Sequence, residues 1–306
     1  MMQVKILGSA AGGAFPQWNC SCANCRSLRA GNFAGKPRSQ TQVAISEDGR
    51  SWFLLGASPD LRAQIESAPE LHPGEGVRQS PIAGIALANA DLDHVLGLLL
   101  LRELQPLCVY ATPSVRCILR EDNSMFAMLQ RSPDQISWED IKLQSQFTLR
   151  DRQGNSASQI EALSLSTHYP AYVTVERQSQ LAPGEASLGF FIQSQSGKKL
   201  AYMPAVPQLG DKLLQQLDGC DILLFDGTFC SDDELIRVQG SGQTAQQMGH
   251  IPVQETLTRL AEVRGPRKIF LHINNTNPML NETSSQYRQV RAAGWEVAED
   301  GWQLDL

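Results

Sequence analysis

Four side chains able to bind metals or carry protons follow one short apolar run. The run Ile85–Leu87 is followed within seven residues by Asn89, Asp91, Asp93 and His94. Polar residues at the end of a buried strand lie where α/β proteins place their active sites. Carboxylates and imidazoles serve there as metal ligands or as general acids and bases. The segment therefore predicts a site of metal or proton chemistry at the end of a strand.

The histidines extend this pattern. The chain has five of them. His168 follows the apolar stretch ALSLST, His272 ends KIFLH, and His250 in MGHIPV precedes a predicted helix. Like His94, each lies at the end of an apolar run or in the loop after one. Such shared contexts indicate function rather than four separate packing roles, whereas His72 in LHPGEG is expected in an exposed loop and is given no role.

Three of the seven cysteines are clustered in CSCANC, as Cys20, Cys22 and Cys25. In a chain of the reducing cytoplasm, such spacing indicates a zinc site rather than disulfides. The other four are scattered among apolar neighbours and are expected to be inert buried thiols. They are Cys108, Cys117, Cys220 and Cys230.

The composition is that of an ordinary globular enzyme or binding protein. The 306 residues are 42% hydrophobic and 19% charged, with a net charge of -6. The charge argues against a nucleic-acid or membrane-surface binder. No apolar stretch reaches the ~20 residues that span a bilayer. The start MMQVKILGSAAGGAF predicts a strand and a glycine turn rather than a signal peptide, so we expect a cytoplasmic protein of undetermined oligomeric state.

Strand-like and helix-like segments alternate along the chain, which predicts a layered α/β sandwich. No linker divides it, so one domain over residues 1–306 is expected, with residues 121–160 as an inserted lid or a hairpin. The predicted strands are Gln3–Leu7, Gln42–Ser46, Ser51–Leu55, Gly84–Leu87, Val109–Ala111, Ile160–Ser166, Leu188–Gln193, Leu200–Met203, Ile222–Phe225 and Lys268–His272. The predicted helices are Cys22–Ala30, Pro59–Ser67, His94–Glu103, Thr112–Arg120, Gln208–Leu217 and Pro252–Val263.

The motif NADLDH resembles the HxHxDH signature of the metallo-β-lactamase fold superfamily. Asn89 and Asp91 stand where that signature has its first two histidines, while Asp93 and His94 match it. The resemblance implies an αββα sandwich of two mixed β-sheets flanked by helices. It also implies that the motif supplies ligands to a metal site.

The same resemblance extends to the later ligand positions of the superfamily. His168 in STHYP and His272 match its remaining histidines, whereas Pro204 stands where the aspartate that bridges two metals is expected. The resemblance thus leaves Asp93, His94 and His272 as ligands of one metal. Two imidazoles and a carboxylate form the facial triad of non-haem Fe(II) oxygenases. Asp91 and His168 are then expected to face the substrate as catalytic residues.

Two further motifs resemble parts of this superfamily. The stretch GSAAGGAFPQWNCSCANC resembles the phosphonate-pathway phosphodiesterases, which bind a structural zinc through CxCxxC and a later histidine. Asn275 stands at that histidine's position here, so Asn275, a water or another side chain completes the zinc site. FDGTF with GHIPV resembles a charge relay in which Asp226 orients His250 and His250 moves protons; a helix-capping and packing role is the other interpretation.

Taken together, the motifs resemble the family of coenzyme PQQ biosynthesis B proteins (PqqB). The resemblance implies a role in making pyrroloquinoline quinone (PQQ) from a peptide-derived glutamate–tyrosine unit, through hydroxylation of the tyrosine ring with Fe(II) and O₂. Two other hypotheses remain: a carrier that transports PQQ or its precursor, and a metal-dependent hydrolase. Arg38 and Arg62 are candidates for binding substrate carboxylates, although either also fits a surface position.

Overall fold

The computed structural model describes residues 1–133 and 135–306, and it divides into two compact units. The first unit comprises Met1–Leu7, Gln42–Lys198 and Gly301–Leu306. The second comprises Gly8–Thr41 and Lys199–Asp300. The expected single domain over 1–306 stays a prediction. None of the helices in the described part of the chain has the length and apolar character that a bilayer crossing requires.

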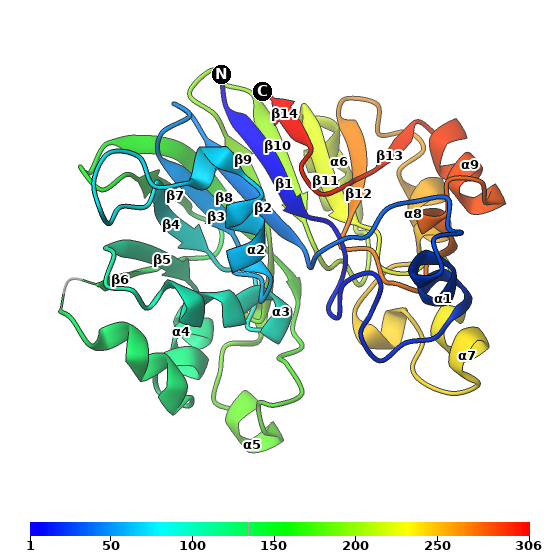
Figure 1. The fold of residues 1–306 in the computed structure, drawn as a ribbon, viewed down its shortest axis with the longest axis horizontal. Coiled ribbons are helices and arrows are strands. Elements are labelled where there is room, and N and C mark those ends of the chain that lie inside the picture. Colours follow the sequence, from blue (N-terminus) through cyan, green and yellow to red (C-terminus); the bar gives the residue numbers. More distant parts are fainter. Residues whose placement is uncertain (134) are drawn as a thin grey trace. The chain divides into compact units, whose positions relative to one another are not determined.

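The first unit contains a seven-stranded mixed sheet in the order β14-β1-β2-β3-β4-β5-β6 (Figure 1). Strands β3 to β6 run parallel to one another, whereas β2 pairs antiparallel with β3, and β1 with β14. The strands are β1 (Gln3–Gly8), β2 (Gln42–Ser46), β3 (Trp52–Leu55), β4 (Ile82–Ala86), β5 (Leu107–Ala111), β6 (Ile136–Asp140) and β14 (Gln303–Asp305).

A second layer of the first unit is antiparallel. It consists of β7 (Gln146–Arg150), β8 (Ser156–Ser166) and β9 (Ser187–Gln193), with β8 paired to both neighbours. The ring of Tyr110 on β5 stacks on Phe147 of β7 at 5.6 Å, and its hydroxyl accepts a hydrogen bond from the Arg150 backbone N–H. The predicted lid or hairpin over 121–160 thus contains the edge strand β6 and most of a β7–β8 hairpin. Residue 134 within it lies outside the described residues.

Short helices of the first unit pack their apolar sides on the seven-stranded sheet. Leu61 of α2, Val95 of α3 and Ile118 of α4 join strand residues such as Ile85 and Val109 in one buried cluster. The helices are α2 (Leu61–Glu66), α3 (Leu92–Val95), α4 (Pro113–Arg120) and α5 (Val175–Gln178). The 3₁₀ segments are η1 (Pro69–Leu71), η2 (Leu96–Leu101), η3 (Ser124–Gln130) and η4 (Pro183–Glu185).

The predicted helix His94–Glu103 is wrong in type. The chain instead forms the single turn α3 and then the 3₁₀ segment η2. The Gly97 N–H donates to the carbonyl of Ala57, outside the helix. A Cβ at position 97 would lie 2.3 Å from the Ser58 carbonyl oxygen, so only glycine permits this approach. A tertiary contact therefore replaces the helical hydrogen bond that the apolar pattern predicted.

The second unit is built on four parallel strands in the order β10, β11, β12, β13 (Figure 1). They are β10 (Lys199–Met203), β11 (Ile222–Asp226), β12 (Arg267–Leu271) and β13 (Trp295–Val297). All five residues of β11 are buried, as expected for an apolar strand covered on both faces. The helices are α1 (Ala23–Arg29), α6 (Asp211–Asp218), α7 (Glu234–Gln239), α8 (Val253–Arg259) and α9 (Ser285–Ala292), with 3₁₀ segments η5 (Gln246–Met248) and η6 (Pro278–Leu280).

Trp295 on β13 anchors the core of the second unit. Its ring stacks on Phe270 of β12 at 4.1 Å and meets Phe225 of β11 edge to face at 6.0 Å.

Because the Trp295 side chain is 1% exposed, the substitution Trp295→Ala leaves a cavity and should lower the free energy of unfolding by about 3–5 kcal/mol. Urea titration measures this. Trp18→Ala is the control, because Trp18 is 85% exposed and its loss should change stability by less than about 0.5 kcal/mol.

Candidate functional site

The segment after β4 is held on both sides before it reaches the polar residues. The Leu87 N–H donates to the carbonyl of Tyr110 on β5, and the Leu188 N–H of β9 donates to the carbonyl of Ala88. The buried Asn89 side chain then accepts a hydrogen bond from the Asp91 N–H at 3.0 Å. Asn89 thus closes the loop with its oxygen, which gives a structural reason for an amide at this position.

His94 is fixed by the loop that follows β3. Its carbonyl accepts the Ala57 N–H at 2.7 Å, and its own N–H donates to the Asp91 carbonyl. A Cβ on Gly56, whose φ is +87°, would lie 3.3 Å from His94 Nδ1. Glycine therefore serves both the backbone conformation and the close approach of the imidazole. The loop is itself held by the buried Gln42, whose side chain bonds Gly56 and Ser58.

Asp93 and His94 are neighbours on the single turn α3. Asp93 Oδ2 lies 4.0 Å from His94 Nε2. His94 is 2% exposed, while Asp93 is partly exposed. The first unit thus offers one carboxylate and one imidazole side by side. The backbone of His94 is held by hydrogen bonds at both its N–H and its carbonyl.

Asp91 and His168 lie in the same unit. Asp91 is the N-cap residue of α3, and His168 follows β8, with its Nδ1 3.2 Å from the Ser166 hydroxyl. Tyr172, which sequence reasoning missed, donates its hydroxyl to the carbonyl of Ala90 at 2.5 Å. Burial, and secondly the negative charge of Asp91, raise the pKa of Tyr172 to about 12. Tyr172 therefore stays a hydrogen-bond donor at neutral pH.

In the second unit, Asp226 is the hub of a buried polar cluster at the end of β11. This fully buried carboxylate accepts the backbone N–H groups of Val206 and Thr228, the Thr228 hydroxyl, and lies 2.8 Å from His250 Nδ1. Burial alone would raise its pKa, but the charge and hydrogen bond of His250 outweigh it and hold the pKa of Asp226 below its ordinary value. The predicted partners Asp226 and His250 are thus in direct contact.

His272 joins this cluster. It follows β12 in the left-handed conformation, with φ +56°, and its Nδ1 lies 2.8 Å from the Thr228 hydroxyl oxygen. Its ring stacks on that of His250 at 5.4 Å. A non-glycine residue at positive φ is uncommon and marks functional sites. Thr228 was missed by sequence reasoning, and its signal is its place two residues after Asp226 in FDGTF.

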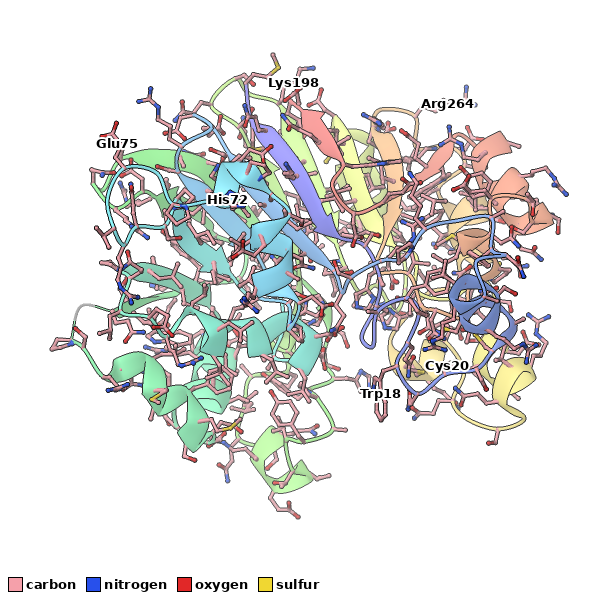
Figure 2. All side chains as sticks on the ribbon, in the orientation of Figure 1. Trp18, Cys20, His72, Glu75, Lys198 and Arg264 are labelled. Atoms are coloured by element: carbon pink, nitrogen blue, oxygen red, sulfur yellow. The ribbon has the colours of Figure 1, made fainter. Side chains whose placement is uncertain are left out.

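The three clustered cysteines converge in the second unit. Cys20, Cys22 and Cys25 have sulfurs within 4.8 Å of one another. Figure 2 labels Cys20 and Trp18, both in the loop that leads into α1. The Asn275 side-chain nitrogen lies 3.2, 3.6 and 3.3 Å from the sulfurs of Cys20, Cys22 and Cys25. Three sulfurs and one carboxamide thus face a common point.

The donor set fits a tetrahedral zinc ion. Zinc prefers thiolate ligands, and rotation of the Asn275 carboxamide would turn its oxygen toward the sulfurs. Backbone N–H groups already point at two sulfurs, from Cys22 to Cys20 and from Cys25 to Cys22. Burial raises the pKa of Cys22 to about 11, whereas for Cys20 these hydrogen bonds outweigh burial and lower the pKa. Metal binding would therefore displace at least the Cys22 proton.

A buried carboxylate supports the turn that carries Asn275. Glu234 on α7 accepts the Thr276 hydroxyl at 2.5 Å and the Cys230 N–H at 2.6 Å. It is 4% exposed, and burial raises its pKa from the ordinary 4.5 to about 7. Nothing in the cysteine pattern pointed to Glu234, because its role depends on tertiary contact.

The predicted site residues thus fall into two sets. Asp91, Asp93, His94 and His168 belong to the first unit, while Asp226, His250, His272 and the cysteine cluster with Asn275 belong to the second. The triad Asp93, His94 and His272 draws on both units and stays a prediction.

Arg38 is 4% exposed and donates hydrogen bonds to Ser9 and to the Ala298 carbonyl, so its guanidinium connects two loops rather than binding substrate. Arg62 is exposed on α2, and His72 lies in an exposed loop (Figure 2).

Comparison with known proteins defines the class. The model of a beta-lactamase superfamily domain matches residues 51–273. The chain is 42% identical to coenzyme PQQ synthesis protein B of Methylorubrum extorquens strain PA1, and 39% identical to that of Azotobacter vinelandii, over the full length of each. It belongs to the coenzyme PQQ synthesis protein B family.

Solved structures agree with this assignment. The crystal structure of Zn²⁺-bound PqqB from Methylobacterium extorquens is 40% identical, covers 99% of this chain and 100% of its own, and has a TM-score of 0.90. A diphosphatase from the PhnP family, 19% identical with a TM-score of 0.68 over 100% of this chain and 98% of its own, shares the fold. The predicted fold class, two mixed β-sheets flanked by helices, is confirmed.

Glu234 predicts a specific pH dependence of stability. Its pKa is raised on folding, so the folded chain holds more protons than the unfolded chain between pH 4.5 and about 7. Its contribution to stability is therefore full below this window and is lost as pH rises through it, by on the order of 3 kcal/mol. Glu234→Gln should remove this loss.

Urea titrations from pH 4 to 8 measure the difference in unfolding free energy between the parent and Glu234→Gln. The parent should lose stability relative to the variant as pH rises. Glu75→Gln, at an exposed loop position, controls for the loss of one charge (Figure 2). Parallel curves for the parent and Glu234→Gln would contradict the assignment.

Proposed function

We propose that this protein acts in PQQ biosynthesis as an Fe(II)- and O₂-dependent hydroxylase of the tyrosine ring in a glutamate–tyrosine precursor. Relatives of the same length, about 40% identical, carry the name coenzyme PQQ synthesis protein B. Each hydroxylation places one atom of O₂ on a ring carbon. The second oxygen atom leaves as water after taking up two electrons from an external reductant and two protons from solvent.

The donor set carries this proposal. Asp93 and His94 offer a carboxylate and an imidazole from one helical turn, and His272 offers a second imidazole whose Nδ1 is engaged with Thr228. Two imidazoles and one carboxylate suit Fe(II) and leave positions open for O₂ and substrate. Iron supplies the activation of O₂ when bound, which no side chain of the protein provides.

The remaining residues of the site are assigned to the substrate. Asp91 and His168 orient the phenol and accept its proton. His250 exchanges protons at Nε2, since its Nδ1 is held by the Asp226 carboxylate at 2.8 Å. Tyr172, beside the start of α3, donates a hydrogen bond that keeps Ala90 and the adjoining Asp91 in place.

A two-metal hydrolase is poorly supported. Its mechanism needs two ions to clamp the attacking and leaving oxygens. The Asn89 side-chain oxygen already accepts a hydrogen bond from the Asp91 N–H, and Pro204 after β10 has no ligand atom in its side chain. Asp91 and His168 alone are too few ligands for a second tightly bound ion.

The central experiment is an anaerobic reconstitution with Fe(II), followed by O₂ uptake with a glutamate–tyrosine dipeptide and ascorbate. The parent should bind one active-site iron and form a ring-hydroxylated product. His94→Ala should lose both the iron and the turnover. Asp91→Ala should keep the iron and lose at least about a hundredfold in rate, the lower end of the range for a general acid or base.

His72→Ala is the matched control, because this histidine lies in an exposed loop and should change neither iron content nor rate. Binding of PQQ or its precursor without turnover would favour the carrier instead. Two tightly bound metals outside the cysteines, with ester or phosphoester cleavage, would favour the hydrolase. Iron retained by His94→Ala would show that the ligand assignment is wrong.

We further propose that Cys20, Cys22, Cys25 and Asn275 hold one structural zinc. Cys22→Ser should lower the zinc content by one ion per chain and reduce the melting temperature, because a structural zinc contributes directly to folding stability. Elemental analysis and thermal unfolding measure both quantities. Cys108→Ser is the control and should keep the zinc. The expectation of a buried thiol is wrong for Cys108 and Cys117, which are half-buried, and is confirmed for Cys220 and Cys230. Unchanged zinc content in Cys22→Ser would refute the site.

A further inference from the structure

The Thr228 hydroxyl lies at the centre of four polar contacts in the second unit. It is 2.7 Å from Asp226 Oδ1 and 2.9 Å from the His272 carbonyl oxygen. It also lies 2.8 Å from His272 Nδ1 and 3.1 Å from His250 Nδ1. Thr228 is 3% exposed, so water does not share these contacts freely.

A hydroxyl has one proton to donate, and this fixes the direction of the network. Its two nearest oxygen partners, the Asp226 carboxylate and the His272 carbonyl, can only accept. The proton therefore goes to an oxygen, and the lone pairs of Thr228 face the imidazoles. His250 Nδ1 has its own acceptor in Asp226 Oδ2 at 2.8 Å. The Thr228 oxygen is thus left to accept a proton from His272 Nδ1.

We infer that Thr228 is a positioning residue that holds His272 with its proton on Nδ1, so that Nε2 is the ring nitrogen that would bind the active-site metal. This inference rests on the proposed role of His272 as an iron ligand. Metal-binding histidines commonly donate their second ring N–H to such a partner, which sets both tautomer and ring orientation.

The backbone explains why this residue reaches His272. The Gly227 N–H donates to the Leu271 carbonyl at 2.7 Å, and the Asn274 N–H donates to the Thr228 carbonyl at 3.1 Å. A Cβ at position 227 would lie 2.9 Å from Phe270 Cβ and 3.0 Å from the Leu271 carbonyl oxygen. Glycine before the threonine therefore lets the ends of β11 and β12 approach closely enough for the hydroxyl contact.

The test compares Thr228→Val, which keeps the shape but removes the hydroxyl, with Thr228→Ser, which keeps the hydroxyl. Thr256→Val is the matched control: this threonine in α8 is also buried, and its hydroxyl has no hydrogen-bond partner among the residues that the structure describes. Two quantities are measured on protein that carries zinc at the cysteine site. One is the tautomer of His272, from proton–nitrogen correlation spectra of ¹⁵N-histidine-labelled protein. The other is the affinity for Co(II) or Fe(II), from anaerobic competition with a chelator.

The parent, Thr228→Ser and Thr256→Val should show His272 with its proton on Nδ1. Thr228→Val should show a mixture or the Nε2–H form, and its metal affinity should fall about 10–100-fold. Thr228→Ser should recover most of that affinity. Thermal unfolding checks that each variant is folded. If Thr228→Val does not fold, the His272 tautomer of the parent and of Thr228→Ser still tests the inference.

Two results would overturn the inference: an Nε2–H tautomer in the parent, or unchanged tautomer and affinity in folded Thr228→Val. Failure of the proposed function is distinguishable from these. If His272→Ala keeps its active-site metal, the ligand assignment is wrong, whatever the tautomer. If His272→Ala loses the metal while Thr228→Val keeps full affinity, only the role of Thr228 is wrong.

Discussion

The buried carboxylate of Asp226 is the constraint on which the chemistry of the second unit depends. A charge in a low-dielectric interior persists only if hydrogen bonds surround it. Here the donors come from the segment after β10, through Val206, from Thr228 beyond β11, and from His250 before α8. Satisfying one carboxylate therefore fixes the ends of neighbouring parallel strands. His272 joins the same network through Thr228.

Buried hydrogen bonds also position the polar residues of the first unit. Gln42 and Gly56 shape the loop after β3, and this loop fixes the backbone of His94. Asn89 closes the turn before α3 by accepting the Asp91 N–H. The polar side chains at the end of β4 are thus held by buried amides and backbone groups. Such supporting hydrogen bonds keep functional side chains within the small tolerances that chemistry requires.

The sequence predicted most of the strands, because buried apolar runs such as Ile222–Phe225 have few alternatives. Among the helices it predicted α1, α2, α4, α6 and α8. It missed β13 and β14, since three-residue strands carry too short a pattern to detect. It also missed β6, β7, α5, α7 and α9, whose residues are mostly exposed or half-buried and give no continuous apolar run. It failed at His94–Glu103, where a contact of Gly97 with Ala57 overrides local periodicity. Tertiary contacts of this kind have no signature in a single sequence.

The predictions of the site residues divide in the same way, between local patterns and tertiary contacts. Cys20, Cys22 and Cys25 were recognised because metal-ligand spacing is local, and Asp226 with His250 through a paired motif. Thr228 and Glu234 were missed, because a hydroxyl or carboxyl acquires its role only from the partners that folding brings to it. The sequence therefore indicates which groups can react, while the structure indicates which groups hold them in place.

The proposed activity inserts oxygen from O₂ into a phenol ring. Its most direct test is turnover of the glutamate–tyrosine dipeptide under ¹⁸O₂, with mass spectrometry of the product and a parallel reaction in H₂¹⁸O. An O₂-dependent hydroxylase should place ¹⁸O on the tyrosine ring from ¹⁸O₂ and none from labelled water. Oxygen derived from water, or a peptide returned without added oxygen, would contradict it.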